Sequence, residues 1–250
     1  MSKVSVIIPV YILNQELLDL TLAAFESLRQ TDWDNEQIEL ILVDDGSPEY
    51  YNVLKTHSDI YIRGHINHGF PWAVNKGIQV SSGEFLVIAN NDIKVSPNWL
   101  KVAKEIFTQD EKVGSVHYRM LEYEQPVELG NDVWVSGKER WCHGSFFVIR
   151  REALPEELYC EMYGKGGYDD YDLFHRMRDI NGWKQTYTNK AAFQHKHSST
   201  QIALDKVDGT RAKRDFLNRE IYKGRFGEYP EIQFAKTFPE QMNLSWRPFP

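Results

Sequence analysis

Residues 82–94, with the sequence SGEFLVIANNDIK, constrain the fold of this chain most strongly. Phe85–Ala89 is a run of five apolar residues, too short for a buried helix, and polar Asn90-Asn91-Asp92 follows it. Such a run is typical of a central strand in a parallel sheet. Open α/β sheets bind their ligands just beyond the carboxyl ends of the strands. Asp92 is therefore placed to meet a metal ion or a phosphate-bearing ligand, although an Asp after a strand also commonly caps a turn or a helix.

The first hundred residues alternate between strand and helix patterns. We expect strands over 4–10, 38–43 and 59–62 before the central strand, and helices over about 15–29, from Pro48 onward, and over 71–80. This alternation is typical of βαβ units in a doubly wound sheet. The second strand runs into Asp44-Asp45-Gly46-Ser47, so the carboxylates of Asp44 and Asp45 are expected at the same sheet edge as Asp92.

Several classes of protein are disfavoured. No G-x-G-x-x-G follows the first strand and no P-loop motif occurs, which argues against dinucleotide-binding and P-loop proteins. The formal net charge of −7 gives no reason to expect nucleic acid or an anionic membrane as a partner. The chain has no apolar run long enough for an integral membrane segment, no signal-peptide layout, and only Cys142 and Cys160, which form no disulfide framework. These features favour a cytoplasmic protein.

The second half of the chain is less regular. We expect helices over 96–109 and from residue 169, strands over 113–119, 144–149 and 184–188, and one basic helix over 202–222, whereas 120–142 carries no clear pattern. The basic helix is interrupted by acids, so we interpret it as a solvated face and not as a nucleic-acid site. Residues 226–250 contain four Pro and four Phe and are expected to form an extended tail on the body of the protein.

A glycine-rich loop, YGKGGY at 163–168, leads into Asp169 and Asp170 at the start of a predicted helix. Leu173, Met177 and Ile180 form the buried stripe expected for this helix. Asp170 lies one turn before that stripe and should face the body of the protein. An inward carboxylate is costly unless something uses it, although an acid in a first turn can also cap a helix or complement its dipole.

Acids at a sheet edge and an inward carboxylate suggest a specific chemistry. Mg²⁺ or Mn²⁺ typically takes one or two carboxylates plus substrate phosphates, and it can stabilise a pyrophosphate as a leaving group. A carboxylate beside it can deprotonate an attacking hydroxyl. His195 and His197, two apart on an extended segment, share a face and are either ligands or an exposed pair. Together these residues fit transfer from a nucleotide diphosphate donor.

The sequence resembles the family 2 glycosyltransferases with the GT-A fold, and within them the rhamnosyltransferase-like bacterial members. The resemblance rests on ordered blocks: VSVIIPVY at 4–11, LVDDGS at 42–47, NHGFPWAVNKGI at 67–78, GEFLVIANNDI at 83–93, HGSFFVIRREAL at 143–154, YDDYDL at 168–173 and HKHSST at 195–200. It implies an α/β fold with a single Rossmann-like, mostly parallel sheet flanked by helices. The GT-A domain would cover 1–227, with a nucleotide-binding half (1–95) and a less regular acceptor-binding half (96–227), and 228–250 would be a tail packed on the domain.

The resemblance also implies donor-binding and metal-binding residues. The backbone near Pro9 and Tyr11 would hold the base together with Asp44, the first acid of its block, and the donor-binding set is completed by Asp45, Asn75 and Asn91. Asp92 would bind Mn²⁺ or Mg²⁺. His195 would be a further metal ligand, with His197 as the other candidate. Asn90 stands where many members have an acid, and the rhamnosyltransferase-like branch shows a similar N-N-D.

Catalytic roles follow from the same resemblance. Asp170 would be the catalytic base, and Asp169 would bind the acceptor. Trp141, His143 and Gly144 line up with a segment near the donor sugar and the acceptor.

The chain is therefore expected to be an inverting, metal-dependent glycosyltransferase. It would move a sugar, of the hexosyl kind, from a UDP-, dTDP- or GDP-linked donor to an acceptor hydroxyl, with a glycan as the expected acceptor in glycan or polysaccharide synthesis. A homodimer paired through the tail is also an expectation.

Two alternatives remain open. A sugar nucleotidyltransferase usually carries a glycine-rich basic loop after the first strand, which Tyr11-Ile12-Leu13-Asn14 does not resemble. A sugar-binding module with a degraded donor site would fit Asn90 and the many aromatic residues.

Overall fold

The computed structural model describes residues 3–33, 35–135, 144–197, 199–229 and 247–248 of the chain. Its first half alternates strands and helices in the order β1 (Lys3–Val10), α1 (Gln15–Arg29), β2 (Gln37–Asp44), α2 (Tyr51–Lys55), β3 (Ile60–Arg63), α3 (Phe70–Val80) and β4 (Phe85–Ala89). These strands pair in parallel in the order β4-β1-β2-β3. The predicted βαβ alternation is confirmed, and the central strand has the predicted bounds.

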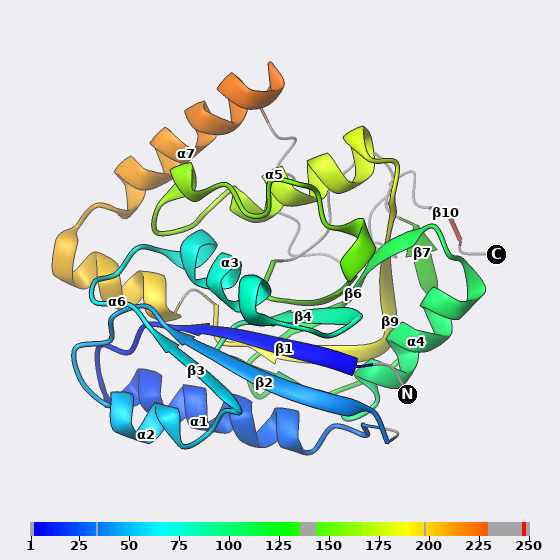
Figure 1. Ribbon diagram of the computed structural model, residues 1–250, viewed down its shortest axis with the longest axis horizontal. Helices are drawn as coiled ribbons and strands as arrows, with labels where there is room; N and C mark the ends of the chain where they lie inside the picture. Colours follow the sequence, from blue (N-terminus) through cyan, green and yellow to red (C-terminus); the bar gives the residue numbers. More distant parts are fainter. Residues whose placement is uncertain (1–2, 34, 136–143, 198, 230–246, 249–250) are drawn as a thin grey trace.

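The second half is more varied. It comprises β5 (Ile93–Val95), α4 (Trp99–Gln109), β6 (Val113–Glu122), β7 (Val133–Val135), β8 (Phe146–Arg150), the 3₁₀ turns Arg151–Ala153 and Glu161–Tyr163, α5 (Asp169–His175) continued by the π-helical turn Arg176–Ile180, β9 (Lys184–His195), α6 (Ser199–Asp208), α7 (Arg211–Phe226) and β10 (Arg247–Pro248). Figure 1 shows the elements of both halves gathered around a single sheet.

The strands of the described residues join one mixed sheet in the order β10-β7-β9-β6-β8-β4-β1-β2-β3, with β5 paired to β9. β8 lies between β4 and β6 and is antiparallel to both, whereas β9 runs parallel to β6. The central strand β4 therefore joins the parallel first half to the mixed second half. β10 pairs with β7 at the far edge of the sheet.

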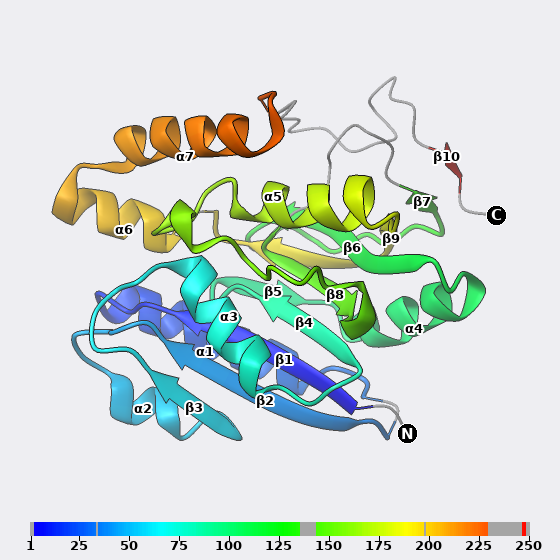
Figure 2. The same cartoon turned by 45° about the horizontal axis from the view of Figure 1, so that its top comes forward.

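Helices cover both faces of this sheet, and each face has its own apolar core. One core contains Leu17 and Phe25 of α1 together with Trp99 of α4, packed on even-numbered residues of β1 such as Val6. The other contains Val74 of α3 and Leu173 of α5, packed on residues of β1, β2 and β4 that point the other way. Successive strand residues point to opposite faces, which explains this division. Figures 1 and 2 show α3 and α5 on one side and α1 and α2 on the other. The predicted α/β class is confirmed.

Local signals explain where some elements begin. α1 starts at the predicted residue because Asn14 Oδ1 accepts a hydrogen bond from the backbone N–H of Leu17 at 2.9 Å, which caps the helix. The prediction that Pro48 opens the next helix is wrong. Tyr50 adopts a left-handed backbone with φ of 67° immediately before α2, so the helix begins only at Tyr51.

Three further expectations in the second half are corrected. β9 does not end at residue 188 but continues to His195. The basic stretch forms two helices, α6 and α7, because Gly209 between them has φ of +61°. Ile180 is 64% exposed although the helical period places it on the buried stripe of α5. The π-helical turn widens the period after His175 and rotates Ile180 away from the core.

Within the described residues, no helix has the length and apolar character that crossing a membrane requires.

Candidate active site

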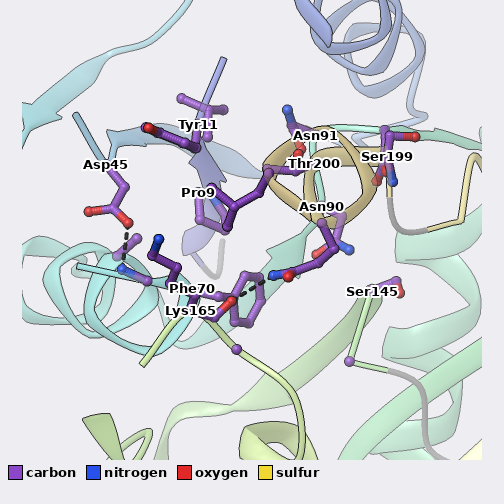
Figure 3. Close-up of a pocket in the computed structure, with 18 of the residues that line it drawn as sticks. Pro9, Tyr11, Asp45, Phe70, Asn90, Asn91, Ser145, Lys165, Ser199 and Thr200 are labelled. Atoms are coloured by element: carbon purple, nitrogen blue, oxygen red, sulfur yellow. Dashed lines mark hydrogen bonds between the residues drawn. The ribbon is translucent and has the colours of Figure 1, made fainter. Parts of the chain in front are cut away.

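A cavity of about 320 Å³ lies beyond the carboxyl ends of β1, β2 and β4 (Figure 3). Three parts of the chain form its wall. The first is the strand ends with the N-terminus of α3, the second is the glycine loop 163–168 with the start of α5, and the third is the end of β9 with the first turns of α6. The lining includes Pro9, Tyr11, Asp45, Asn91, Asp92, Asp169, Asp170 and His195 among the predicted site residues. The structure thus brings together residues that lie more than 180 positions apart in the sequence.

Of the two acids at the end of β2, Asp44 and Asp45, only Asp45 lines the cavity. Its Oδ1 accepts a hydrogen bond from the backbone N–H of His68 at 2.9 Å, and its Oδ2 accepts one from Gly69 at 2.6 Å. Asp44 is fully buried beside the cavity, where it accepts hydrogen bonds from Ser47 and Tyr61. Burial raises the pKa of Asp45, and the N–H groups at the start of α3 oppose that rise.

Asp92 and His195 meet in the cavity wall because β5 pairs with the end of β9, in a register that places Ile93 opposite His195. His195 Nε2 lies 3.1 Å from Asp92 Oδ1, yet this carboxylate oxygen makes no hydrogen bond. Asp92 Oδ2 accepts a long hydrogen bond of 3.4 Å from the backbone N–H of Ser199. Both side chains are nearly inaccessible, at 5% and 7% exposure.

This pair suits a divalent ion that takes its other ligands from elsewhere. Among the described residues, no group of three or more His, Cys, Asp or Glu side chains could hold a metal ion. Adjacent ligands of an octahedral Mg²⁺ or Mn²⁺ lie about 3 Å apart, which matches the separation of Asp92 Oδ1 and His195 Nε2. The amide of Asn90 is next to them, with Nδ2 3.5 Å from His195 Nε2, and its Oδ1 is also buried without a hydrogen-bond partner. The residues present therefore fit an ion that substrate phosphates complete.

The acid pair lines the cavity from the start of α5. Glycine residues in left-handed or related backbone conformations, including Gly166 (φ +95°) and Gly167 (φ +102°), bring the chain to this point. Asp169 Oδ1 accepts a hydrogen bond from the N–H of Gly167 at 2.5 Å, and Asp170 Oδ1 accepts one from Tyr171 at 2.9 Å. Burial raises the pKa of both carboxyls, and the charge of Asp170 raises that of Asp169 further.

The glycine loop is held from outside by α6 and α7. The Asn218 side-chain amide donates to the backbone oxygens of Tyr163, Gly166 and Gly167, at 3.0, 3.0 and 3.1 Å. Gln201 Nε2 donates to the backbone oxygen of Lys165 at 2.6 Å. The two helices therefore fix the loop that carries the acid pair.

The other predicted site residues lie in different surroundings. Asn91 lines the cavity, but its amide donates to Thr21 of α1 at 2.8 Å. Asn75 does not line the cavity, and its side chain instead bonds both backbone groups of Tyr159 at 2.9 Å. His197 lies outside the lining, with its ring 4.8 Å from that of His195. Gly144 lines the cavity, whereas Trp141 and His143 fall outside the described residues.

No site role was predicted from the sequence for the glycine loop or for α6. Lys165, Gly166 and Gly167 line the cavity, as do Ser199, Thr200, Gln201 and Leu204 of α6. Three glycines within the six residues before two acids were a usable signal for the loop. Ser199 and Thr200 at the start of α6 fall within the block HKHSST at 195–200, but no role was predicted for them.

Comparison with known proteins gives one family match and several structural likenesses. The family model described as "Glycosyl transferase family 2" matches residues 5–158, which is more than half of the chain. The curated proteins contain no match. The structure of S. aureus TarS 1-349 resembles this one with a TM-score of 0.63 at 15% identity, covering 90% of this chain and 72% of that one.

A second likeness is to GalNAc-T7, whose crystal structure was solved with UDP, GalNAc and Mn²⁺. The TM-score is 0.59 at 15% identity, covering 78% of this chain and 44% of GalNAc-T7, so the chain spans less than half of that protein. These likenesses concern the fold, and they confirm the predicted GT-A architecture. The family match ends at residue 158, before Asp169, Asp170 and His195.

Proposed function

The chain belongs to glycosyl transferase family 2, and on that premise we propose that it transfers a sugar from a nucleotide diphosphate sugar to an acceptor hydroxyl, with inversion at the anomeric carbon. The observation that carries this proposal is the single cavity in which Asp45, the Asp92–His195 pair and the Asp169–Asp170 pair face one another. A binding module has little use for a buried acid pair, because each carboxylate is costly to bury.

The donor would lie along the sheet edge. Asp45 and the backbone at Pro9–Tyr11 would hold the nucleoside. Asp45, and not Asp44, would bind the nucleobase, because Asp44 lies outside the cavity lining. Asp92 and His195 would hold Mn²⁺ or Mg²⁺, which when bound neutralises diphosphate charge and makes the diphosphate a better leaving group. Asn90 Oδ1, buried and without a hydrogen bond, is positioned to contribute a neutral oxygen beside them.

Asp170 would act as the general base. Its carboxylate takes the proton of the acceptor hydroxyl, whose oxygen attacks the anomeric carbon from the face opposite the diphosphate. The bond from that carbon to the diphosphate oxygen breaks, and its electron pair leaves with the diphosphate. Asp169, held by the glycine loop, would orient the acceptor through a second hydrogen bond.

A screen of UDP-, dTDP- and GDP-sugars with and without Mn²⁺ tests the function. We expect one donor class to be hydrolysed slowly without acceptor, in a metal-dependent way, and released as the nucleoside diphosphate. Release of pyrophosphate from a nucleoside triphosphate would instead indicate a nucleotidyltransferase. Glycan binding without hydrolysis of any donor would indicate a binding module.

The rate of transfer should depend on pH through the raised pKa of Asp170. A general base works only when it is deprotonated, so protonation on the acid side removes activity. Because burial raises the pKa of this carboxyl, the midpoint of the fall in kcat on the acid side should lie at a higher pH than the pKa of about 4 of an ordinary aspartate. Measuring kcat at saturating donor from about pH 4 to 9 checks this, and a flat profile would contradict the base assignment.

Gly144→Ala should impair turnover selectively by displacing the base. A Cβ at position 144 would lie 2.6 Å from Asp170 Oδ2 and 2.7 Å from its Cβ. The Asp170 side chain must therefore shift, and a displacement of about 1 Å in a catalytic group can cost about 10²-fold in rate. Steady-state kinetics should show lower kcat with unchanged donor affinity.

Gly224→Ala provides the matched control, since a Cβ there meets no atom within 4 Å. Equal kcat values for the two variants would contradict the contact between position 144 and the base.

A further inference from the structure

The charges that line the cavity are strongly unbalanced. Within the described part of the chain, four aspartates line the cavity: Asp45, Asp92, Asp169 and Asp170. Among the lysines and arginines of the same described residues, Lys165 alone lines it. A nucleoside diphosphate carries about three negative charges near neutral pH. A single divalent ion does not balance the negative charge of this ligand and of the four aspartates. Binding such a ligand in this cavity therefore needs a further positive charge.

Lys165 is placed at the rim of the cavity with a replaceable partner. Its Nζ lies 3.2 Å from Asp208 Oδ2. Asp208 is the last residue of α6 and lies one helical turn after Leu204, which lines the cavity. The two charged side chains are 34% and 23% exposed. An ion pair that is exposed to this extent contributes little to stability, so exchanging Asp208 for another anion costs little.

The backbone of Lys165 is fixed, while its side chain is not enclosed. Its carbonyl oxygen accepts the hydrogen bond from Gln201 (Figure 3). Gly166 beside it is held by Asn218. A lysine on such a loop carries a mobile ammonium on a flexible four-carbon stem. The fixed backbone keeps that stem anchored at the cavity, so the ammonium can move from Asp208 to a ligand without any change in the loop.

We propose that Lys165 is a diphosphate ligand, which exchanges its ion pair with Asp208 for the diphosphate oxygens of the nucleotide. The proposal rests on the proposed function and adds a residue to it. Lysine binds phosphate groups as a compact point charge. Asp208 then serves as a resting partner that holds the ammonium at the rim when the cavity is empty of nucleotide.

The Lys165 ammonium should stabilise the bound leaving group, the nucleoside diphosphate, more than the bound donor, the nucleotide sugar. When the bond to the anomeric carbon breaks, a further negative charge collects on the terminal phosphate, and an ammonium beside it stabilises that charge. Loss of Lys165 should therefore weaken the binding of the nucleoside diphosphate more than the binding of the nucleotide sugar. It should also lower kcat.

Calorimetric titration of UDP, dTDP and GDP in the presence of Mn²⁺ tests the inference on the full chain. For the diphosphate that binds the wild-type protein, Lys165→Met should raise Kd by about 10- to 100-fold, the usual range for a hydrogen bond to a charged group. Lys165→Arg should retain most of the affinity. Lys206→Met, which removes an exposed lysine of α6 outside the cavity lining, should change nothing.

Asp208→Asn gives an independent measurement. It keeps the oxygen that accepts hydrogen bonds from Thr210 but removes the competing charge, so the diphosphate should bind more tightly. Wild-type affinity in Lys165→Met overturns the inference, as does unchanged affinity in Asp208→Asn if the Met variant does not fold. Failure of the wild-type protein to bind any of the three diphosphates would overturn the proposed function itself, which is a separate result.

Discussion

Asp170→Asn is expected to lower kcat for sugar transfer by about 10²- to 10⁴-fold, the usual contribution of a general base. The substitution keeps the shape of the side chain and an oxygen for the N–H of Tyr171, but an amide cannot take a proton from the acceptor. The residues proposed to hold the donor and the metal ion are other ones, so the affinity for the nucleotide sugar should not change. Pre-steady-state transfer with radiolabelled donor, together with calorimetry of donor binding, measures both quantities.

Stability measurements separate this effect from damage to the fold. Burial raises the pKa of Asp170, so the folded protein holds that proton more tightly than the unfolded chain does. The resulting stabilisation is present below the ordinary carboxyl pKa of about 4 and is lost as pH rises through the raised value. At neutral pH the buried, ionised carboxylate therefore destabilises the folded protein. The Tm of Asp170→Asn should be no lower than that of the wild-type protein.

Asp172→Asn makes an informative contrast two residues away. Asp172 is fully buried and pairs with Arg176 Nε at 2.6 Å and with Arg225 Nε at 2.5 Å, but it does not line the cavity. Removing its charge leaves the Arg176 guanidinium without its carboxylate and leaves Arg225 with Glu157 alone, so a lower Tm is expected. Normal turnover in Asp170→Asn with loss of turnover in Asp169→Asn would move the base role to Asp169.

Asp92→Ala is expected to abolish the response of nucleotide binding to Mn²⁺. In the wild-type protein, Mn²⁺ should strengthen binding of the nucleoside diphosphate. Removing a buried charged ligand should weaken the metal-dependent complex by about 10²-fold or more, while the weak binding without metal stays as it is. Titrations with and without Mn²⁺ give the two affinities, and a full Mn²⁺ response in Asp92→Ala would remove this residue from the metal site.

The two histidines provide a matched test of the same site. His195→Ala should reduce the Mn²⁺ response because His195 Nε2 lies beside Asp92 Oδ1. His197→Ala should retain it, since this residue lies outside the cavity lining even though the two rings are 4.8 Å apart. The reverse pattern would assign the ligand role to His197.

The sequence was most informative where a local pattern of apolar residues marks an element. The apolar run at Phe85–Ala89 predicted a buried central strand with correct bounds, and the rule for strand ends placed Asp92 at the cavity. The same rule could not choose between Asp44 and Asp45. Neighbouring residues at a strand end point in opposite directions, so the choice depends on the residue at which β2 leaves the sheet.

The remaining features depend on contacts between segments far apart in sequence. His195 belongs to the site because β9 extends beyond residue 188 and pairs with β5, which no local pattern in the sequence indicated. Lys165 reaches the cavity through a loop whose backbone is set by glycines and by Asn218 of α7. Ile180 was assigned to the buried stripe because a π-helical turn leaves no signature in the spacing of apolar residues.

The pairing of β5 with β9 has a consequence for the order in which the newly made chain can mature. The parallel half of the sheet is complete once Ala89 has emerged, whereas His195 is made 103 residues after Asp92, counting 195 minus 92. At about 5 to 20 residues per second, translation needs roughly 5 to 20 s to cover that interval. Throughout this time the nascent chain lacks the histidine of the proposed metal site, so ribosome-bound intermediates should acquire metal-dependent nucleotide affinity only after β9 has paired with β5.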